Sequence, residues 1–289
     1  MEKEEQLYVR GLTFAILGTV VLSFDALLIR LSGTSGISVV FYRALFTCIS
    51  SSILFFSTRK RKAFSILASG GFPMIISGLM WGLSGVGFTL GVQTAGAANT
   101  LVFIALSPLF AAAFSGIFFK IVPSLSTILA TCVSIFGIWF MYREGFGDLD
   151  PKGLLFALSA PLFLGSNLSF MRNHKEMARL PLVMIGGMTG SLIALVVSQG
   201  DLKMSVESIL PLVLLGLVVI PFAQTMISTG TRYINAPEAA LVNSSETVIG
   251  FFYVWLFLGE IPNADFMIGA SIVFLSITVN SVYQAKAKK

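Results

Sequence analysis

The stretch GLTFAILGTVVLSFDALLIR (residues 11–30) returns in altered form 142 residues later as GLLFALSAPLFLGSNLSFMR (residues 153–172). Each run has 20 residues, the length that a helix needs to cross the ~30 Å hydrocarbon core of a bilayer. The two runs begin with the same Gly-Leu pair and end on the same residue, arginine, and Asp25 falls opposite Asn167. They therefore indicate an internal repeat built from membrane-spanning helices.

Apolar runs of this kind fill the chain from end to end. Charged residues, glycines and prolines divide the sequence into ten such segments, each of which we predict to be a transmembrane helix. The predicted spans are 11–32, 38–57, 68–92, 96–119, 123–142, 153–172, 181–199, 208–231, 236–258 and 263–284. If each span uses about 20 residues, too few remain for a soluble catalytic domain.

A second set of matches supports the repeat. At an offset of 139 residues, Gly91 aligns with Gly230 and Pro123 aligns with Pro262. We therefore predict two units of five helices, residues 1–144 and 145–289. Because five is odd, the second unit enters the membrane from the opposite side. The predicted fold is an all-α polytopic membrane protein, with ten transmembrane helices in two inverted five-helix repeats around a central cavity.

The charge pattern predicts the orientation. Only 11% of the residues are charged, against roughly 25% in soluble domains, so an ordinary soluble enzyme is excluded. The net charge of +5 is spread between apolar spans, which argues against nucleic-acid binding. With the N-terminus inside, 14 of the 19 Lys and Arg residues fall on the inner side, four of them at 59–62. We therefore expect a multi-pass protein of the cell membrane (inner or plasma membrane) with both termini cytoplasmic.

The sequence contains no recognisable catalytic or cofactor motif. It has no phosphate-binding P-loop, so ATP coupling within the chain has no support. One histidine, His174, and two separated cysteines make neither a metal site nor a catalytic triad. We predict no catalytic residues, no metal and no cofactor. The absence of a potassium-type filter argues against a channel.

Three ionisable residues inside predicted spans are the leading site candidates, because charge within a membrane is costly and usually faces the interior. Glu246 lies ten residues into its helix, about 15 Å along it and therefore near the bilayer midplane. Asp25 and Arg43 both lie about 8–10 Å below the outer surface and are placed to pair between the first two helices. Either such a pair locks the two helices together or it contacts the solute directly. A gate that breaks and reforms the pair would reconcile the two readings.

Four further polar or aromatic side chains complete the predicted cavity. Asn243 precedes Glu246 in the most polar intramembrane stretch, and Asn167 and Gln224 add amides from two other spans. Trp81 lies deep in the third span, where its indole N–H needs a partner. The prolines Pro108, Pro161 and Pro221 interrupt backbone hydrogen bonding and expose carbonyl groups to such a cavity.

The sequence resembles the EamA branch of the drug/metabolite transporter superfamily. The residues that carry the resemblance are Phe41-Tyr42-Arg43-Ala44, Gly165-Ser166-Asn167 and Leu258-Gly259-Glu260-Ile261-Pro262. The first repeat departs from the pattern, with Leu22-Ser23-Phe24-Asp25 in place of a Trp-Gly-Ser-Asn segment and Ile121 opposite Glu260. The resemblance implies helices 1–4 and 6–9 around the cavity, helices 5 and 10 at the periphery, and export of amino acids or related metabolites.

We therefore predict a secondary active or facilitative transporter of a small polar, amino-acid-like solute, exporting by alternating access. Carboxylate and guanidinium groups in one cavity can bind both ends of a zwitterion. The predicted partners are this solute and the lipid bilayer. Proton coupling through the acids and facilitated exchange both stay open, and no oligomeric state follows from the sequence. The alternatives are a nontransporting membrane interaction or scaffold protein with an inherited fold and, third, a membrane enzyme.

Overall fold

The computed structural model describes residues 2–34, 36–120, 125–142, 150–174, 177–230, 233, 236–259 and 264–287, and these residues are helical apart from the connections. The helices are α1 (Glu2–Leu22), α2 (Phe24–Leu31), α3 (Ile37–Arg59), the 3-10 turn η1 (Lys60–Lys62), α4 (Ala63–Thr94), α5 (Ala97–Ile104), α6 (Ser107–Phe119), α7 (Leu125–Tyr142), α8 (Pro151–Asn173), α9 (Leu180–Val197), α10 (Val206–Leu214), the π-helical η2 (Leu215–Val219), α11 (Ile220–Gly230), α12 (Ala236–Leu258) and α13 (Ala264–Ala287). Within these ranges they make the ten passes that the sequence predicts.

Three of the ten passes are interrupted helices. The first pass is α1 followed by α2, the fourth is α5 followed by α6, and the eighth is α10, η2 and α11 in series. The fourth pass bends by 44° between Ala97–Ile104 and Leu109–Phe119. The bend lies beside Pro108, and proline is a residue that does not continue a helix regularly. Interrupted helices of this kind provide backbone groups to binding sites in transporters.

Two predicted helix boundaries are wrong. Helix α1 begins at Glu2 and not at residue 11, so its first turns lie before the apolar run begins. Helix α4 begins at Ala63 and not at residue 68, because a short helical segment precedes the pass. Gly71 separates that segment from the pass with φ of 53° and ψ of −153°, a conformation that is essentially restricted to glycine.

The packing of the helices repeats between the two halves. Helix α1 runs antiparallel to α11, because Gly230 faces Gly11 and Ala15 while Gly18 faces Ala223. Helix α8 lies against α4 in the equivalent way. There Gly153 faces the end of α4, at Thr94 and Ala95, and Gly87 faces Ala160. In both interfaces the missing Cβ allows one backbone to touch the other.

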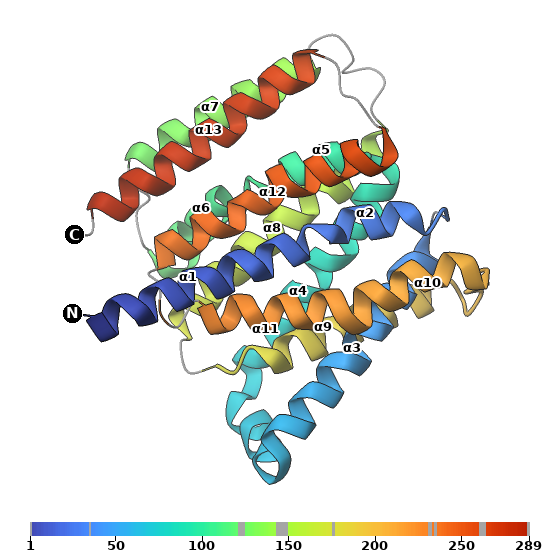
Figure 1. The fold of residues 1–289 in the computed structure, drawn as a ribbon. Coiled ribbons are helices and arrows are strands. Elements are labelled where there is room, and N and C mark those ends of the chain that lie inside the picture. Colours follow the sequence, from blue (N-terminus) through green and yellow to red (C-terminus); the bar gives the residue numbers. More distant parts are fainter. Residues whose placement is uncertain are drawn as a thin grey trace.

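Two further large interfaces join equivalent helices of the two halves. Helix α3 packs on α9, where Gly187 meets the α3 backbone at Ala44 and Cys48. Helix α7 packs on α13, where Gly137 faces Gly269 and the Ser276 hydroxyl donates to the Ala130 carbonyl at 2.8 Å. Figure 1 shows α7 and α13 as a pair at one edge of the bundle, so the fifth and tenth passes are peripheral, as the resemblance implies.

The repeat extends to turn geometry. Lys120 ends α6 and Gly259 ends α12, both with left-handed backbone at φ of 56° and 67°. The two positions are 139 residues apart, the same offset as in the sequence repeat. Gly259 adopts this conformation without strain, whereas the Cβ of Lys120 makes it less favourable. The ten-helix, two-repeat fold predicted from the sequence is confirmed.

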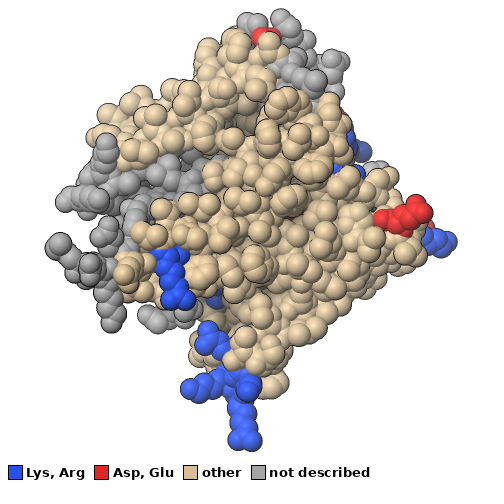
Figure 2. Space-filling view, in the orientation of Figure 1, with Lys and Arg blue, Asp and Glu red and all other residues tan. Residues whose placement is uncertain are grey.

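The outer surface of the bundle is apolar over most of its length. Large side chains such as Val196 and Phe72 are 74% and 72% exposed, although a soluble protein would bury residues of this kind. Figure 2 shows this face almost free of charge over its middle, with charged side chains at its margins and several basic ones gathered towards the bottom. Such a surface is suited to contact with lipid tails.

Candidate functional site

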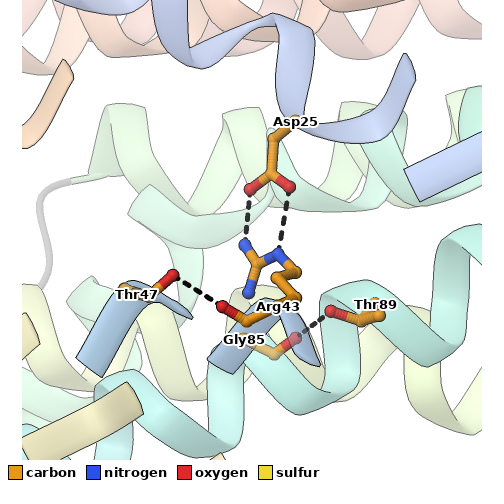
Figure 3. A network of polar contacts seen from close by, with 5 residues as sticks. All are labelled: Asp25, Arg43, Thr47, Gly85 and Thr89. Atoms are coloured by element: carbon orange, nitrogen blue, oxygen red, sulfur yellow. Dashed lines mark hydrogen bonds and ion pairs between the residues drawn. The ribbon is translucent and has the colours of Figure 1, made fainter. Parts of the chain in front are cut away.

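A buried ion pair joins the first two passes. The Arg43 guanidinium of α3 donates from Nε to Asp25 Oδ1 at 3.1 Å and from Nη2 to Asp25 Oδ2 at 2.5 Å (Figure 3). Asp25 is 5% exposed and Arg43 is 7% exposed. Two parallel bonds from a planar guanidinium are the strongest form of such a contact. The pairing proposed from the sequence is therefore present, and it lies in the interior of the bundle.

The third nitrogen of Arg43 faces away from Asp25. Nη1 points toward Gly85 of α4 (Figure 3), and a Cβ at that glycine would come within 3.2 Å of it. No hydrogen bond joins Nη1 to any residue that the structure describes. The Phe88 ring lies near the guanidinium, with Cζ 6.0 Å from the ring centroid. Arg43 therefore holds Asp25 with two nitrogens and presents a third to the space beside α4.

That space is a small cavity between α3, α4 and α9. Its polar lining is Arg43 with Thr47 and Thr89, Trp81 forms an aromatic wall, and the rest is mostly glycine and small apolar side chains. Its volume of about 10 Å³ is enough for about one water molecule. The glycine lining results from the crossing of α4 and α9, where Gly82 and Gly186 face each other backbone to backbone. The close crossing of these two helices therefore also shapes the cavity.

Hydrogen bonds within and between helices fix the backbone that carries Arg43. The Thr47 hydroxyl donates to the Arg43 carbonyl at 2.8 Å, and the Thr89 hydroxyl donates to the Gly85 carbonyl at the same distance (Figure 3). Two helical turns beyond Arg43, the Ser50 hydroxyl donates to the carbonyl of Gly216 in η2 at 2.7 Å. Arg43 is thus positioned by its own helix and by the interrupted eighth pass.

The π-helical segment explains why the Gly216 carbonyl is available. In η2 the amide of Ile220 donates five residues back, to Leu215. In the same pattern, the Gly216 carbonyl would accept from residue 221, but Pro221 has no N–H to donate. The Ser50 hydroxyl donates to this carbonyl instead. Pro221, identified from the sequence as a source of free carbonyl groups, therefore has a defined role at the α3 interface.

Glu246 approaches the ion pair from α12. It is half-buried and lies within electrostatic range of Asp25 and Arg43. One turn further along α12, Gly250 faces the Ser23 carbonyl at the α1–α2 interruption, and beyond it the Tyr253 ring stacks on Phe24 at 4.3 Å. Glu246, Gly250 and Tyr253 are spaced along one helix face. This face directs Glu246 toward the first pass and its ion pair.

Two buried hydroxyls near this contact have no hydrogen-bond partner among the described residues. They belong to Thr19, one turn before Ser23 on α1, and to Thr247, which follows Glu246. Buried polar atoms are nearly always paired, so unpaired ones mark places suited to a polar ligand or water. Their positions on α1 and α12 agree with a polar site at the level of Glu246.

The other predicted site residues take different positions. Trp81 lines the Arg43 cavity and packs on Gly186, and no hydrogen bond of its indole N–H is found within the described part of the chain. Asn167, 1% exposed, accepts a hydrogen bond from Ser77 of α4 and is not among the cavity-lining residues. Gln224 is half-buried on α11, also outside that lining. Asn243 belongs to α12, but its side chain lies outside the described residues, as does Glu260.

The sequence reasoning missed Thr47, Ser50 and the role of Gly85. Serine and threonine within transmembrane helices usually bond to their own backbone, so their identity does not reveal a contact with another helix. Gly85 carries the same signal as the packing glycines around it. Within the described ranges, no three His, Cys, Asp or Glu side chains are grouped as a metal site would require.

Comparison with known proteins places this architecture in a family. A family model described as the EamA-like transporter family matches residues 9–143 and again 151–282. One solved structure, titled only as the crystal structure of a protein, matches 99% of this chain and 99% of its own, with a TM-score of 0.66 and 15% identity. The likeness to that structure concerns the fold. The curated proteins include no match. Because the family model covers both halves, the chain belongs to the EamA-like transporter family.

Proposed function

We propose that this transporter exports a small amino-acid-like solute through a site formed by Arg43, Asp25 and Glu246. The observation that carries the proposal is the position of the Arg43 guanidinium. Its Nε and Nη2 atoms bind Asp25, and its Nη1 atom faces the cavity. A solute carboxylate can bind Nη1 while Nε and Nη2 keep Asp25. Binding then does not require the buried pair to break first, which would be costly.

The charges around Arg43 favour a solute that also carries an amine. Asp25 and Glu246 are two acids near a single guanidinium, so with both acids ionised the group has one negative charge in excess. A proton on Glu246 removes this excess, which supports proton coupling through that acid. A zwitterion then adds no net charge, because its carboxylate can bind Arg43 while its ammonium group lies beside an acid. An anion without an amine would add a further negative charge to the site.

The small cavity supports alternating access. A volume of about 10 Å³ is far below that of an amino acid, so the helices must separate for the solute to enter. The two halves pack in equivalent ways, and equivalent halves can exchange conformations around a shared site. We interpret the small cavity as a closed stage of the proposed cycle. Opening would separate α4 and α9 where their glycines meet.

The proposed orientation follows the charges at the ends of the bundle. Helix α1 begins and α13 ends at one end, and the basic α3–α4 turn lies at that end as well (Figure 1). The exposed Asp201 and the first-turn Glu207 lie at the other end. Under the positive-inside rule both termini are cytoplasmic. We assign the protein to the plasma or inner membrane, with export as the direction.

Solute flux in liposomes tests the proposal. Purified protein is reconstituted in liposomes that are each loaded with one unlabelled solute from a panel. The same solute is then added outside in labelled form, and its uptake in exchange for the internal solute (counterflow) is measured. We expect counterflow for at least one amino acid. R43Q should abolish this uptake, whereas K203Q, which changes an exposed lysine, should retain it. Folded protein without counterflow for any solute would refute the proposal and favour a scaffold.

The same vesicles test proton coupling. An imposed pH gradient should drive net uptake by the parent protein. E246Q should lose the response to the gradient and keep counterflow, because an amide cannot carry a proton through the cycle. If E246Q and D25N both respond as the parent does, neither acid couples transport to protons.

A further inference from the structure

The α3–α4 turn carries four consecutive basic residues that have no acidic neighbour in the sequence. Arg59 ends α3, Lys60–Lys62 form η1, and all four side chains are exposed. The chain contains no Asp or Glu between Asp25 and Glu144, so neither α3 nor α4 supplies a counter-charge. None of the four forms an ion pair with a residue that the structure describes. Figure 2 shows basic side chains at this tip, at the bottom of the view, with no acidic ones among them.

The segment that follows the basic turn has the character of a helix lying at a membrane surface. It runs from Ala63 to the Gly71 break, which turns it away from the direction of the α4 pass. Phe64 is 73% exposed, its ring lies 5.6 Å from that of Phe56, and Phe72 beyond the break is also exposed. Aromatic rings beside basic residues are typical of segments at the headgroup level.

The positive-inside rule accounts for charge on this side of the membrane, but not for these additional features. Orientation alone requires neither a bend at a glycine nor exposed aromatic rings next to the charges. Four exposed cations beside an apolar surface complement a layer of phosphate groups. In the proposed orientation this tip faces the cytoplasmic leaflet, which is rich in anionic lipids.

We propose that the α3–α4 tip, Arg59–Lys62 with the Ala63–Gly70 segment, binds the headgroups of anionic phospholipids. The same two helices carry Arg43, Trp81 and Gly85, which line the cavity. Headgroup binding at the tip would therefore attach α3 and α4 to the membrane surface, and these are helices that line the cavity and move when it opens. The lipid acts here as a bound partner of the transporter, in addition to being its solvent.

A fluorophore on the short segment tests this without any transported solute. On a background of C48A and C132A, an environment-sensitive dye is attached through S65C, an exposed position. The protein is reconstituted in vesicles of phosphatidylcholine alone or of phosphatidylcholine with one-third phosphatidylglycerol. We expect a blue shift of emission in the anionic vesicles, at least halved by 0.5 M salt because screening weakens the attraction.

The matched variants decide between lipid binding and orientation alone. R59Q/K60Q/R61Q/K62Q should lose the shift, whereas K152Q/K203Q, which removes charge at the opposite end, should keep it. Equal emission in both vesicle types, or an unchanged shift in the fourfold variant, would overturn the proposal. A shift that appears only when a soluble acidic protein is added would also overturn it. A failure of solute flux would leave this result unaffected.

Discussion

Asn167 of α8 accepts a hydrogen bond from the Ser77 hydroxyl of α4, at the position that the internal repeat makes equivalent to Asp25. In the first half that position holds a carboxylate bound to Arg43, and in the second half a neutral amide bound to a serine. The two halves therefore share a backbone arrangement but not a charged site. A movement that separates these contacts would break a buried ion pair in the first half and a neutral hydrogen bond in the second. The free energy needed for the movement therefore differs between the two halves.

The ion pair should show strong coupling in a double-mutant cycle. R43Q should lower the free energy of unfolding by about 3–5 kcal/mol, because it leaves the Asp25 carboxylate buried without its partner. D25N should cost less, since Glu246 remains near the guanidinium. The double variant D25N/R43Q should lose less than the sum of the two, which thermal or denaturant unfolding in detergent measures.

The exposed pair of Asp201 and Lys203 provides the control for that cycle. Its atoms lie 4.0 Å apart with both side chains largely exposed, so D201N should leave the unfolding transition unchanged. Additive losses for Asp25 and Arg43 would show that the buried contact contributes no specific coupling.

The hydrogen bond from Ser50 to Gly216 should contribute to the α3–η2 interface. S50A removes the donor from a carbonyl that Pro221 cannot satisfy, and we expect a loss of about 1–3 kcal/mol in unfolding free energy. S52A is the matched control, because the Ser52 hydroxyl bonds only within its own helix, to the Cys48 carbonyl. Equal stability of the two variants would mean that another donor reaches Gly216.

The α4–α9 crossing should not tolerate a methyl group. A Cβ at Gly186 would overlap the Trp81 ring and the Gly82 backbone, so G186A should cost about 1–3 kcal/mol of unfolding free energy. G85A places a methyl group near only the Arg43 Nη1 atom and should cost less. We expect G85A to weaken counterflow, because Gly85 lies beside the Arg43 Nη1 atom, and G186A to lower mainly stability, because Gly186 lies at the α4–α9 backbone contact. Equal effects of the two variants on counterflow and on stability would contradict these separate roles.

The bend in α4 should depend on glycine at position 71. G71A forces a side chain into a backbone conformation that is almost exclusive to glycine, and a loss of about 1–3 kcal/mol in unfolding free energy is expected. The neighbouring variant G70A is the comparison, because its Cβ would meet the Met74 side chain without any backbone strain at that position. Equal unfolding temperatures for the two variants would contradict the requirement for this bend.

Much of the architecture followed from the sequence because the bilayer acts on the chain as a uniform solvent. Apolar length set the ten passes, and the odd number of helices per repeat set their inversion. The cost of charge in lipid identified Asp25, Arg43 and Glu246 as interior residues before any contact was known. Each of these inferences depends only on the free energy of moving a residue from water into the membrane.

Only the tertiary structure decided which side chains meet. The contact of Arg43 with Asp25, the opening of Nη1 toward Gly85 and the replacement of a missing amide by Ser50 depend on how far each helix is rotated and where helices cross. Those rotations are set by backbone contacts such as Gly82 with Gly186. Hydropathy reports how deeply a residue lies in the membrane, and it carries little information about rotation around the helix axis, because lipid and protein interior are similarly apolar.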